Sequence, residues 1–405
     1  MTKALYISYD GMTDPLGQSQ VLPYLKGLSE KGIEFHLISF EKEERFEKFR
    51  DHIQKICDEA GIHWYPLSYT KKPPLLSTIY DTQRMKQLAH KLHRKHNFRI
   101  VHCRSYIAAL VGSGMKKRFG TKFLFDMRGF WADERIDGNI WSLNNPVFRT
   151  VYNYFKKKEI LFFREADHVV SLTYNGKNEI EGWKEFDDQK PLIEVIPCCV
   201  DLDLFDPAKV SNEQRVQLKE ELGIKAGEFI LGYVGSIGTW YMLPEMLHFF
   251  KVLHSSNPNS RFLFVTGEDP SVIRATAETL DLPQDAIYIT SCLHKEVPLH
   301  ISIFDASIFF IRPTFSKKAS SPTKQGEIMA MGIPLICNAG VGDTDLVVEK
   351  YEAGTVLRML TEDSFKENTE FRFNKERTMR GAHEFYGLEE GIKRYYGIYE
   401  RLINK

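Results

Sequence analysis

The chain has 405 residues and a formal net charge of zero at pH 7. Its length is sufficient for two domains of ordinary size. Without excess positive charge it has no electrostatic support for binding nucleic acid, so we expect no nucleic-acid partner. The charge is uneven, because residues 1–197 contain 31 Lys and Arg against 25 Asp and Glu, whereas the remainder contains 23 against 29. The basic first half either faces something anionic, such as a membrane surface, or carries solvated charge that has no partner.

The cysteines and the N-terminal residues indicate the compartment. The six cysteines form no Cys-x-x-Cys pair and have no His-rich companion, so neither a disulfide framework nor a zinc cluster is indicated. A reducing cytoplasm is the simplest location for such a chain. The N-terminus enters an apolar strand pattern directly, unlike a signal peptide, and no apolar run approaches the roughly 18 residues of a spanning helix. We expect a cytoplasmic protein that at most lies on the inner face of a membrane.

In the first half, short apolar runs alternate with longer helical patterns. The runs predict strands at 4–9, 35–40, 99–103, 122–127, 168–173 and 193–197. The helical patterns lie near 18–31, 43–60, 78–96, 106–119 and 146–165. Alternation of this kind predicts parallel strands with helices on both faces of the sheet.

The segment after the first run, YDGMTDPLGQSQ, is rich in turn-forming residues and leads into a helical pattern. Its glycines would let the backbone approach a ligand closely, which makes Gly17 a candidate nucleotide-binding residue. The alternative is that the segment is only a turn, since it contains no Gly-x-Gly-x-x-Gly pattern.

The same alternation restarts in the second half. Apolar runs predict strands of a second sheet at 229–235, 262–267, 286–290, 306–311 and 334–338. The segment IPCCVDLDLFDPAK, rich in Pro and Asp, separates the two sets and is interpreted as an interdomain linker. We therefore predict an α/β protein of two Rossmann-like, doubly wound domains that face each other across a cleft. Ligands of such sheets bind at the carboxyl ends of the strands.

Residues 321–336, SPTKQGEIMAMGIPLI, combine a cation and a carboxylate at a predicted helix start. Ser321 is suited to the N-cap and Pro322 to the first helical position, and Gly332 should end the helix. A helix start is an anion site, to which Lys324 in the first turn adds a full charge. The segment follows the strand at 306–311, so it should lie at the ligand-binding edge.

Glu327 shares a helix face with Thr323 and is placed one turn below this anion site. A carboxylate there cannot hold phosphate, but it can accept hydrogen bonds from sugar hydroxyls, as carboxylates that bind ribose do in other nucleotide folds. The alternative is that Lys324 and Glu327 form a surface pair on a well-capped helix.

These segments resemble the glycosyltransferases of family 4. The resemblance rests on DPLGQSQVLPYLKGLSEKGIEFHLISF, FDMRGFWADE, EADHVVSLT, VIPCCVDLDLF and SPTKQGEIMAMGIPLI, and it extends over nearly the whole chain. It implies a retaining enzyme of the GT-B fold, of the bacterial type that builds surface polysaccharide or a related glycoconjugate. The implied reaction moves a hexosyl or N-acetylhexosaminyl group from a nucleotide-diphosphate sugar to a saccharide or polyprenyl-linked acceptor.

The resemblance also implies a domain organisation. Residues 1–197 would bind the acceptor, residues 198–385 the nucleotide sugar, and a C-terminal helix at 386–405 would return to the first domain. The first domain would also provide any peripheral membrane contact, for which the basic segment 83–99 is the candidate. The alternative for that segment is a solvated helix.

Family motifs can be carried over to individual residues in the second half. Glu327 matches the second glutamate of the family's Glu, seven residues, Glu motif, which binds the ribose hydroxyls of the donor. The first glutamate is replaced by Ala319. Ser236 and Tyr241 stand where the family commonly has an Arg and a Lys that hold the diphosphate. The sequence thus departs from the family pattern twice.

Other groups must then supply the positive charge that stabilises a departing diphosphate. The candidates are Lys324, Arg312, the helix start at Ser321 and Thr323, and the backbone of the loop 235–238, with Gly235 and Ser236. Arg312 has an alternative interpretation as a solvent-facing strand end.

In the first half, Asp126 and Arg128 stand where a predicted strand meets its loop, and the resemblance assigns acceptor and sugar binding to this region. The alternative is an ion pair that supports the loop. The family mechanism needs no enzyme nucleophile, because a phosphate oxygen of the leaving group takes the acceptor's proton. We expect no cofactor and no metal, and we assign the Asp-Leu-Asp of the linker to a turn.

Two other functions remain open. The replaced residues are also consistent with a catalytically degenerate subunit that binds a nucleotide sugar or a glycan. The fold is also that of nucleotide-sugar 2-epimerases.

Overall fold

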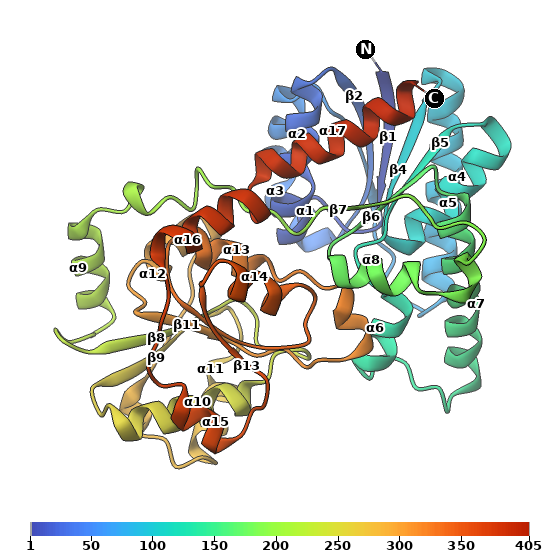
Figure 1. Cartoon of the computed structure of the whole chain (residues 1–405). Helices are drawn as coiled ribbons and strands as arrows, with labels where there is room; N and C mark the ends of the chain where they lie inside the picture. The colour runs from blue at the N-terminus through green and yellow to red at the C-terminus, as the bar shows by residue number, and fades with distance from the viewer. Residues whose placement is uncertain (1, 405) are drawn as a thin grey trace. The chain divides into compact units, whose positions relative to one another are not determined.

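The chain folds into two units, each built around one parallel sheet, in a computed structural model that describes residues 2–404 (Figure 1). The first unit comprises Met1–Pro197 and Leu388–Lys405, and the second comprises Cys198–Gly387. The chain therefore passes from one unit to the other after residue 197 and returns after residue 387.

The first unit contains seven strands in the order β3-β2-β1-β4-β5-β6-β7. Their bounds are β1 Thr2–Ser8, β2 Ile33–Glu41, β3 His63–Ser68, β4 Ile100–Arg104, β5 Lys122–Asp126, β6 His168–Ser171 and β7 Ile193–Val195. Its helices are α1 Pro15–Gln20, α2 Leu22–Glu30, α3 Glu43–Glu59, α4 Leu76–His96, α5 Ser105–Phe119, α6 Trp131–Asp137, α7 Pro146–Glu165, α8 Tyr174–Glu181 and α17 Leu388–Asn404. The strand order reverses between β1 and β4, which is the point where doubly wound sheets bind their ligands.

The second unit contains six strands in the order β10-β9-β8-β11-β12-β13. Their bounds are β8 Phe229–Val234, β9 Ser260–Val265, β10 Ile287–Thr290, β11 Ala306–Phe309, β12 Leu335–Asn338 and β13 Gly354–Leu357. Its helices are α9 Asn212–Glu221, α10 Leu243–Ser256, α11 Pro270–Glu278, α12 Val297–Ile301, α13 Thr323–Ala330, α14 Thr344–Lys350, α15 Glu362–Glu367 and α16 Lys375–Gly381. Here the order reverses between β8 and β11.

The predicted fold class is confirmed, since both sheets are parallel and doubly wound. All eleven predicted strands are present within a few residues of their predicted bounds. Two strands, β3 and β13, were not predicted. Both lie at a sheet edge and are partly exposed, so they lack the continuous apolar run of a strand covered on both faces.

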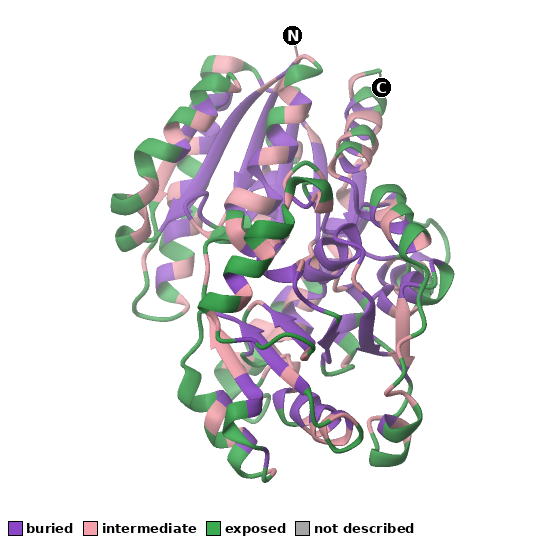
Figure 2. Ribbon diagram, turned by 90° about the vertical axis from the view of Figure 1, so that its left-hand side faces the viewer, coloured by how far each residue is buried: buried purple, intermediate pink, exposed green. Residues whose placement is uncertain are grey.

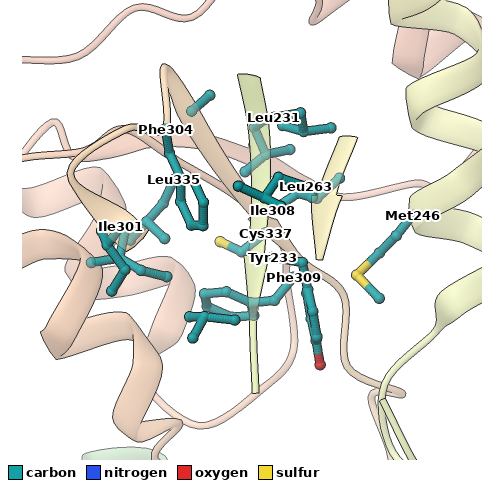
Figure 3. Close-up of a cluster of buried hydrophobic side chains, with 14 of the residues drawn as sticks. Leu231, Tyr233, Met246, Leu263, Ile301, Phe304, Ile308, Phe309, Leu335 and Cys337 are labelled. Atoms are coloured by element: carbon teal, nitrogen blue, oxygen red, sulfur yellow. The ribbon is translucent and has the colours of Figure 1, made fainter. Parts of the chain in front are cut away.

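The strands form the core because helices cover both faces of each sheet. In Figure 2 the strands are mostly purple, whereas the outer helical faces are green. In the second unit the core side chains include Leu231, Leu263, Ile308 and Leu335, one from each of four adjacent strands (Figure 3). Tyr233 joins the same cluster, with its hydroxyl at the edge of the cluster.

The glycine-rich segment after β1 is held by a buried carboxylate. Glu41, at the end of β2, accepts hydrogen bonds from the Met12 and Thr13 backbone N–H groups at 2.8 and 3.0 Å, and from the Thr13 hydroxyl at 2.6 Å. Gly17 lies inside α1 and is buried. A Cβ atom there would lie 2.2 Å from the Gly11 carbonyl oxygen, so Gly17 is required for close packing of the chain against itself. Close packing alone requires a glycine here, and the assignment of Gly17 as a nucleotide-binding residue stays a prediction.

The C-terminal helix α17 belongs to the first unit and packs beside α2 (Figure 1). Its Tyr399 hydroxyl lies 2.9 Å from His102 Nδ1, and its Tyr395 hydroxyl donates to Asp126 Oδ2 at 3.0 Å. Both partners lie in β4 and β5, so α17 is bound to the centre of the sheet through polar groups as well as through apolar packing.

The Asp-Leu-Asp of the linker forms a turn, as predicted. Asp201 Oδ1 accepts from the backbone N–H groups of Asp203 and Leu204 at 3.0 and 3.2 Å. Among the described residues, no helix is long and apolar enough to cross a membrane.

Replacing Gly17 with Ala should lower the free energy of unfolding by about 1–3 kcal/mol, because the new methyl group meets backbone atoms that cannot move away alone. Gly114→Ala is the control, since Gly114 lies in α5 and a Cβ there meets nothing within 4 Å. That substitution should be neutral or stabilising. Thermal denaturation of both variants tests this, and equal melting temperatures would contradict it.

Candidate active site

Lys324, in the first turn of α13, is buried between two tyrosine rings at the carboxyl end of β8. Its side chain is directed at Gly235, where a Cβ atom would lie 3.1 Å from Lys324 Nζ. The ammonium lies 4.1 Å from the centre of the Tyr233 ring and 3.8 Å from that of Tyr241, and it donates to the Tyr233 hydroxyl at 2.9 Å. Gly235 has φ of 105°, a backbone conformation that side chains rarely adopt. Because glycine has no side chain, it also leaves the space that Lys324 occupies.

The electrostatics of Lys324 favour a bound anion. Burial lowers the pKa of Lys324 well below its ordinary value, and the nearby Glu327 carboxylate only partly opposes this. Within residues 2–404, the only hydrogen bond that this ammonium donates is to Tyr233. An ammonium has three donors, so two are available to a ligand. A phosphate oxygen at this point would accept a hydrogen bond from the Lys324 ammonium, and its negative charge would stabilise the protonated lysine.

Glu327 lies one turn further along α13 and is only 8% exposed. The interpretation of Lys324 and Glu327 as a surface pair is therefore wrong, because both side chains are buried. His294, from the segment after β10, lies with Nε2 3.4 Å from Glu327 Oε1. The Glu327 carboxylate is thus oriented by the His294 imidazole on one side. Burial, together with this carboxylate, raises the pKa of Tyr241 to about 12, so the Tyr241 hydroxyl stays protonated.

The start of α13 differs from the prediction. The helix begins at Thr323 with Pro322 at the N-cap, and no side chain caps it. Ser321 accepts a hydrogen bond from the Cys198 backbone N–H at 3.1 Å instead. The prediction of Ser321 as N-cap is wrong because proline, with its fixed φ, already takes that place and the serine satisfies a backbone donor of the linker. Thr323 stands in the first turn, as predicted, and Gly332 follows the helix end with φ of 69°.

The loop after β8 and the end of β11 contribute the remaining predicted residues. Ser236 is exposed, and its carbonyl accepts from the Tyr233 hydroxyl. The Arg312 backbone N–H donates to the Trp240 carbonyl at 2.9 Å, which brings the two segments together. The Arg312 side chain is exposed and makes no hydrogen bond or ion pair within residues 2–404. The backbone hydrogen bond therefore holds Arg312 beside this loop, whereas its side chain is not held there.

Lys317 is a buried cation that the sequence analysis did not identify. It lies in the 3-10 turn Phe315–Ala319, is 5% exposed, and places its ammonium 3.6 Å from the centre of the Trp240 ring. Ala319, which replaces the first motif glutamate, is fully buried two residues later. No periodic sequence pattern marks Lys317. The adjacent Lys317 and Lys318 just before SPTK were the sequence feature that could have indicated a cation here.

In the first unit, Asp126 and Arg128 come together at the end of β5. Arg128 Nη1 lies 3.8 Å from Asp126 Oδ1, and His102 Nε2 lies 3.7 Å from Asp126 Oδ2. Burial raises the pKa of Asp126, but Arg128, His102 and Arg104 together outweigh it, so that the pKa lies below its ordinary value. The carboxylate is therefore ionised, with Tyr395 as a further donor. Our alternative of an ion pair that supports the loop agrees with this geometry.

The loop after β5 is held in an uncommon conformation. Arg128 has φ of 58°, in the left-handed region that side chains rarely adopt, and Gly129 follows with φ of 130°. Arg104, at the end of β4, is buried and lies with Nε 3.4 Å from Asp10 Oδ2, just after β1. Charged groups thus meet where the strand order reverses between β1 and β4.

Each unit places charged side chains at the carboxyl ends of its central strands, around Lys324 in the second sheet and around Asp126 and Arg104 in the first. Several partners escaped the sequence analysis: His102, Arg104, Tyr233, His294 and Tyr395. They come from other strands, from the segment after β10 or from α17, so their signal is spatial and has no counterpart in local sequence. Two Rossmann-like units, each built on a parallel sheet, are the architecture of the GT-B glycosyltransferases.

Comparisons with known proteins agree with this class. Residues 18–204 match the family described as Glycosyltransferase Family 4, and residues 214–379 match the family described as Glycosyl transferases group 1. An alpha-monoglucosyldiacylglycerol synthase from Acholeplasma laidlawii is 27% identical over 150 residues. That match covers 35% of this chain and 35% of the relative, so the chain matches only about a third of that protein's length.

Solved structures share the fold at low identity. Sucrose-phosphate synthase from Thermosynechococcus elongatus superimposes over 100% of both chains, with a TM-score of 0.71 and 14% identity. A glycosyltransferase from Rickettsia africae covers 99% of this chain and 98% of its own, with a TM-score of 0.69 and 16% identity. Anabaena HepE, in complex with UDP and glucose, covers 100% of both chains, with a TM-score of 0.69 and 13% identity. The chain belongs to the family 4 glycosyltransferases and has their GT-B fold.

The contact between His294 and Glu327 predicts a measurable pKa. The hydrogen bond to Glu327 raises the pKa of His294 above 6.5, although burial opposes it. The stabilisation from the charged pair is therefore complete below pH 6.5 and is lost as pH rises through the raised pKa. NMR titration of the histidine rings should show the His294 midpoint falling in Glu327→Gln, with exposed His52 unchanged. An unchanged His294 midpoint would show that the contact is absent in solution.

Proposed function

We propose that this glycosyltransferase moves a hexosyl or N-acetylhexosaminyl group from a nucleotide-diphosphate sugar to a saccharide or lipid-linked acceptor, with retention of anomeric configuration. The process served would be bacterial polysaccharide or glycoconjugate synthesis. The observation that carries the proposal is the pairing of Lys324 and Glu327 on one buried helix turn, at the end of β8.

The donor half of the proposal follows from that geometry. Lys324, with two donors available and a desolvated charge, suits the diphosphate, and the α13 start at Thr323 adds backbone N–H groups. Glu327 accepts hydrogen bonds from ribose hydroxyls, with His294 beside it. Lys317 and Arg312 are further cations for the leaving group. The Anabaena structure holds UDP and glucose, which supports a nucleotide-sugar donor for a chain of the same fold.

The transfer half rests on the first unit. In the retaining mechanism that we propose, a phosphate oxygen of the departing diphosphate takes the acceptor's proton on the same face of the sugar. The chain's own residues then bind and orient. Asp126 is ionised and accepts hydrogen bonds, and Arg128 is fixed by its strained backbone. Electrostatic stabilisation of the leaving group is the larger contribution of the second unit.

A lipid-linked acceptor is supported by an exposed apolar face at the start of α4. Leu76, Ile79 and Tyr80 share one side of the helix and are 65%, 58% and 58% exposed. Lys71 and Lys72 precede them and are exposed, and the remainder of α4 carries further exposed Lys and Arg residues. Apolar side chains beside cations are typical of attachment to an anionic membrane surface. The relative from A. laidlawii is a glucosyldiacylglycerol synthase by name, which agrees with such an acceptor.

Calorimetry with UDP, GDP and ADP tests the donor site. At least one nucleotide should bind, and Lys324→Met and Glu327→Gln should each weaken binding by at least about tenfold, because each removes a charged partner. Binding should also take up a proton at alkaline pH, since a diphosphate raises the lowered pKa of Lys324, and this uptake should vanish in Lys324→Met. Lys225→Met, at an exposed turn, is the control.

Failure of every nucleotide to bind, or unchanged binding by Glu327→Gln, would refute the donor site. Nucleotide binding without transfer or donor hydrolysis would favour the catalytically degenerate subunit. The observation behind that alternative is the buried Ala319, which replaces the first glutamate of the family motif. An epimerised donor in the absence of acceptor would favour a 2-epimerase.

Sedimentation with lipid vesicles tests the acceptor side. The protein should bind vesicles that contain phosphatidylglycerol more tightly than neutral phosphatidylcholine vesicles. Leu76→Ser with Ile79→Ser should weaken this binding at least tenfold, since each buried methylene contributes about 0.8 kcal/mol. Val272→Ser is the matched control, because Val272 is 51% exposed on α11 of the other unit. Equal binding by all three proteins would exclude this face as the membrane contact.

A further inference from the structure

A second group of polar side chains lies at the amino end of the first sheet, opposite the edge that holds Asp126. His36 of β2 is in register with His63, the first residue of β3. Glu34 lies two residues before His36, so it is on the same face of β2. The two strands thus bring two imidazoles and a carboxylate together. Nothing in the proposed transfer reaction uses them.

The distances among these groups are those of a metal site. His36 Nε2 lies 3.2 Å from Glu34 Oε1, and His63 Nε2 lies 3.7 Å from the same oxygen. One ligand atom from each residue lies within 4.8 Å of the other two. Ligand atoms around a tetrahedral zinc ion are about 3.3 Å apart, as bonds of about 2.0–2.1 Å require. The three atoms therefore need to approach one another by at most about 1.5 Å to hold an ion.

The buried histidine is already oriented for this role. His36 has no exposed surface, and its Nδ1 lies 3.0 Å from the Tyr65 hydroxyl. Without an ion, Nε2 donates to the Glu34 carboxylate, which can only accept, and the Tyr65 hydroxyl donates to Nδ1. An ion would replace the Nε2 proton, and Nδ1–H would then donate to the Tyr65 hydroxyl. Ligating histidines in metal sites are commonly oriented by such a hydrogen bond from the other ring nitrogen. The ring also stacks on His63, with centroids 4.5 Å apart.

A fourth nitrogen is close by. His96, at the end of α4, has its ring centre 4.1 Å from that of His36. Its Nε2 is buried and has no hydrogen-bond partner within residues 2–404. One competing cation is present, because Lys3 Nζ lies 3.8 Å from Glu34 Oε1. The Lys3 side chain is 40% exposed, so it can turn into solvent when an ion neutralises Glu34.

We propose that His36, His63 and Glu34 bind Zn²⁺, or a divalent ion of similar ligand preference, with water or His96 in the fourth position. Imidazole nitrogen with one carboxylate selects such ions over Mg²⁺ and Ca²⁺, which prefer oxygen ligands. The ion would join β2 to β3, the edge strand of the sheet, and would stabilise a strand that has only one neighbour. The site is thus structural, and it lies at the edge of the sheet opposite the residues proposed for transfer.

Calorimetric titration of the untagged, chelator-treated protein with zinc chloride tests the proposal. We expect one ion per chain and a higher melting temperature with zinc, whereas magnesium chloride should have no effect. His63→Ala and Glu34→Gln should each weaken zinc binding at least tenfold. His63 and Glu34 are partly exposed, so both variants should fold. His52→Ala, at an exposed position on α3, should bind zinc like the unchanged protein.

Cobalt chloride gives an independent readout. The absorption bands of tetrahedral Co²⁺ should appear with the unchanged protein and His52→Ala, and they should be absent with His63→Ala. Zinc binding that is equally strong in His63→Ala, or no binding by the unchanged protein, would overturn the proposal. In either case the three side chains are only a stacked aromatic cluster with a hydrogen-bonded carboxylate.

Discussion

A lysine ammonium enclosed by two tyrosine rings is the constraint on which the second unit's site depends. Removing a charge from water costs several kcal/mol unless partners replace the water. The cation–π contacts of Lys324 offset about 2 kcal/mol of this, and the Tyr233 hydroxyl provides one hydrogen bond. The fold therefore holds Lys324 with less compensation than its charge requires, and an anion would supply the remainder. Proteins tolerate such a deficit mainly at functional sites.

The two units place buried groups of opposite charge at the carboxyl ends of their central strands. Each sheet reverses its strand order once; Lys324 lies at that point in the second unit, whereas Asp126, at the end of β5, lies one strand away from it in the first. Asp126 has the Arg128 guanidinium 3.8 Å away and accepts a hydrogen bond from Tyr395 at Oδ2, but its Oδ1 is buried without a hydrogen-bond partner; within residues 2–404 Lys324 donates a single hydrogen bond. Each site thus retains a buried polar group whose hydrogen-bonding capacity is not filled within residues 2–404.

The sequence predicted what depends on local pattern. Apolar runs marked eleven strands, the edge strands β7 and β10 among them, while the edge strands β3 and β13 gave no run. Lys324 and Glu327 were found because helix spacing puts them on adjacent turns. Ser321 was misassigned because the Cys198 N–H, distant in sequence, takes its oxygen. His294 and the group of His36, His63 and Glu34 arise only from strand pairing and loop position, which no local spacing records.

Because α17 belongs to the first unit, translation supplies all residues of the second unit before it supplies the last residues of the first. Residues 198–387 form a continuous stretch and have all their own strands before α17 is made. The first unit, although translated earlier, has no Tyr395 or Tyr399 until the second unit has left the ribosome, so that His102 and Asp126 lack these hydroxyl partners. Because domains generally fold as units during synthesis, the half made first is the half completed last.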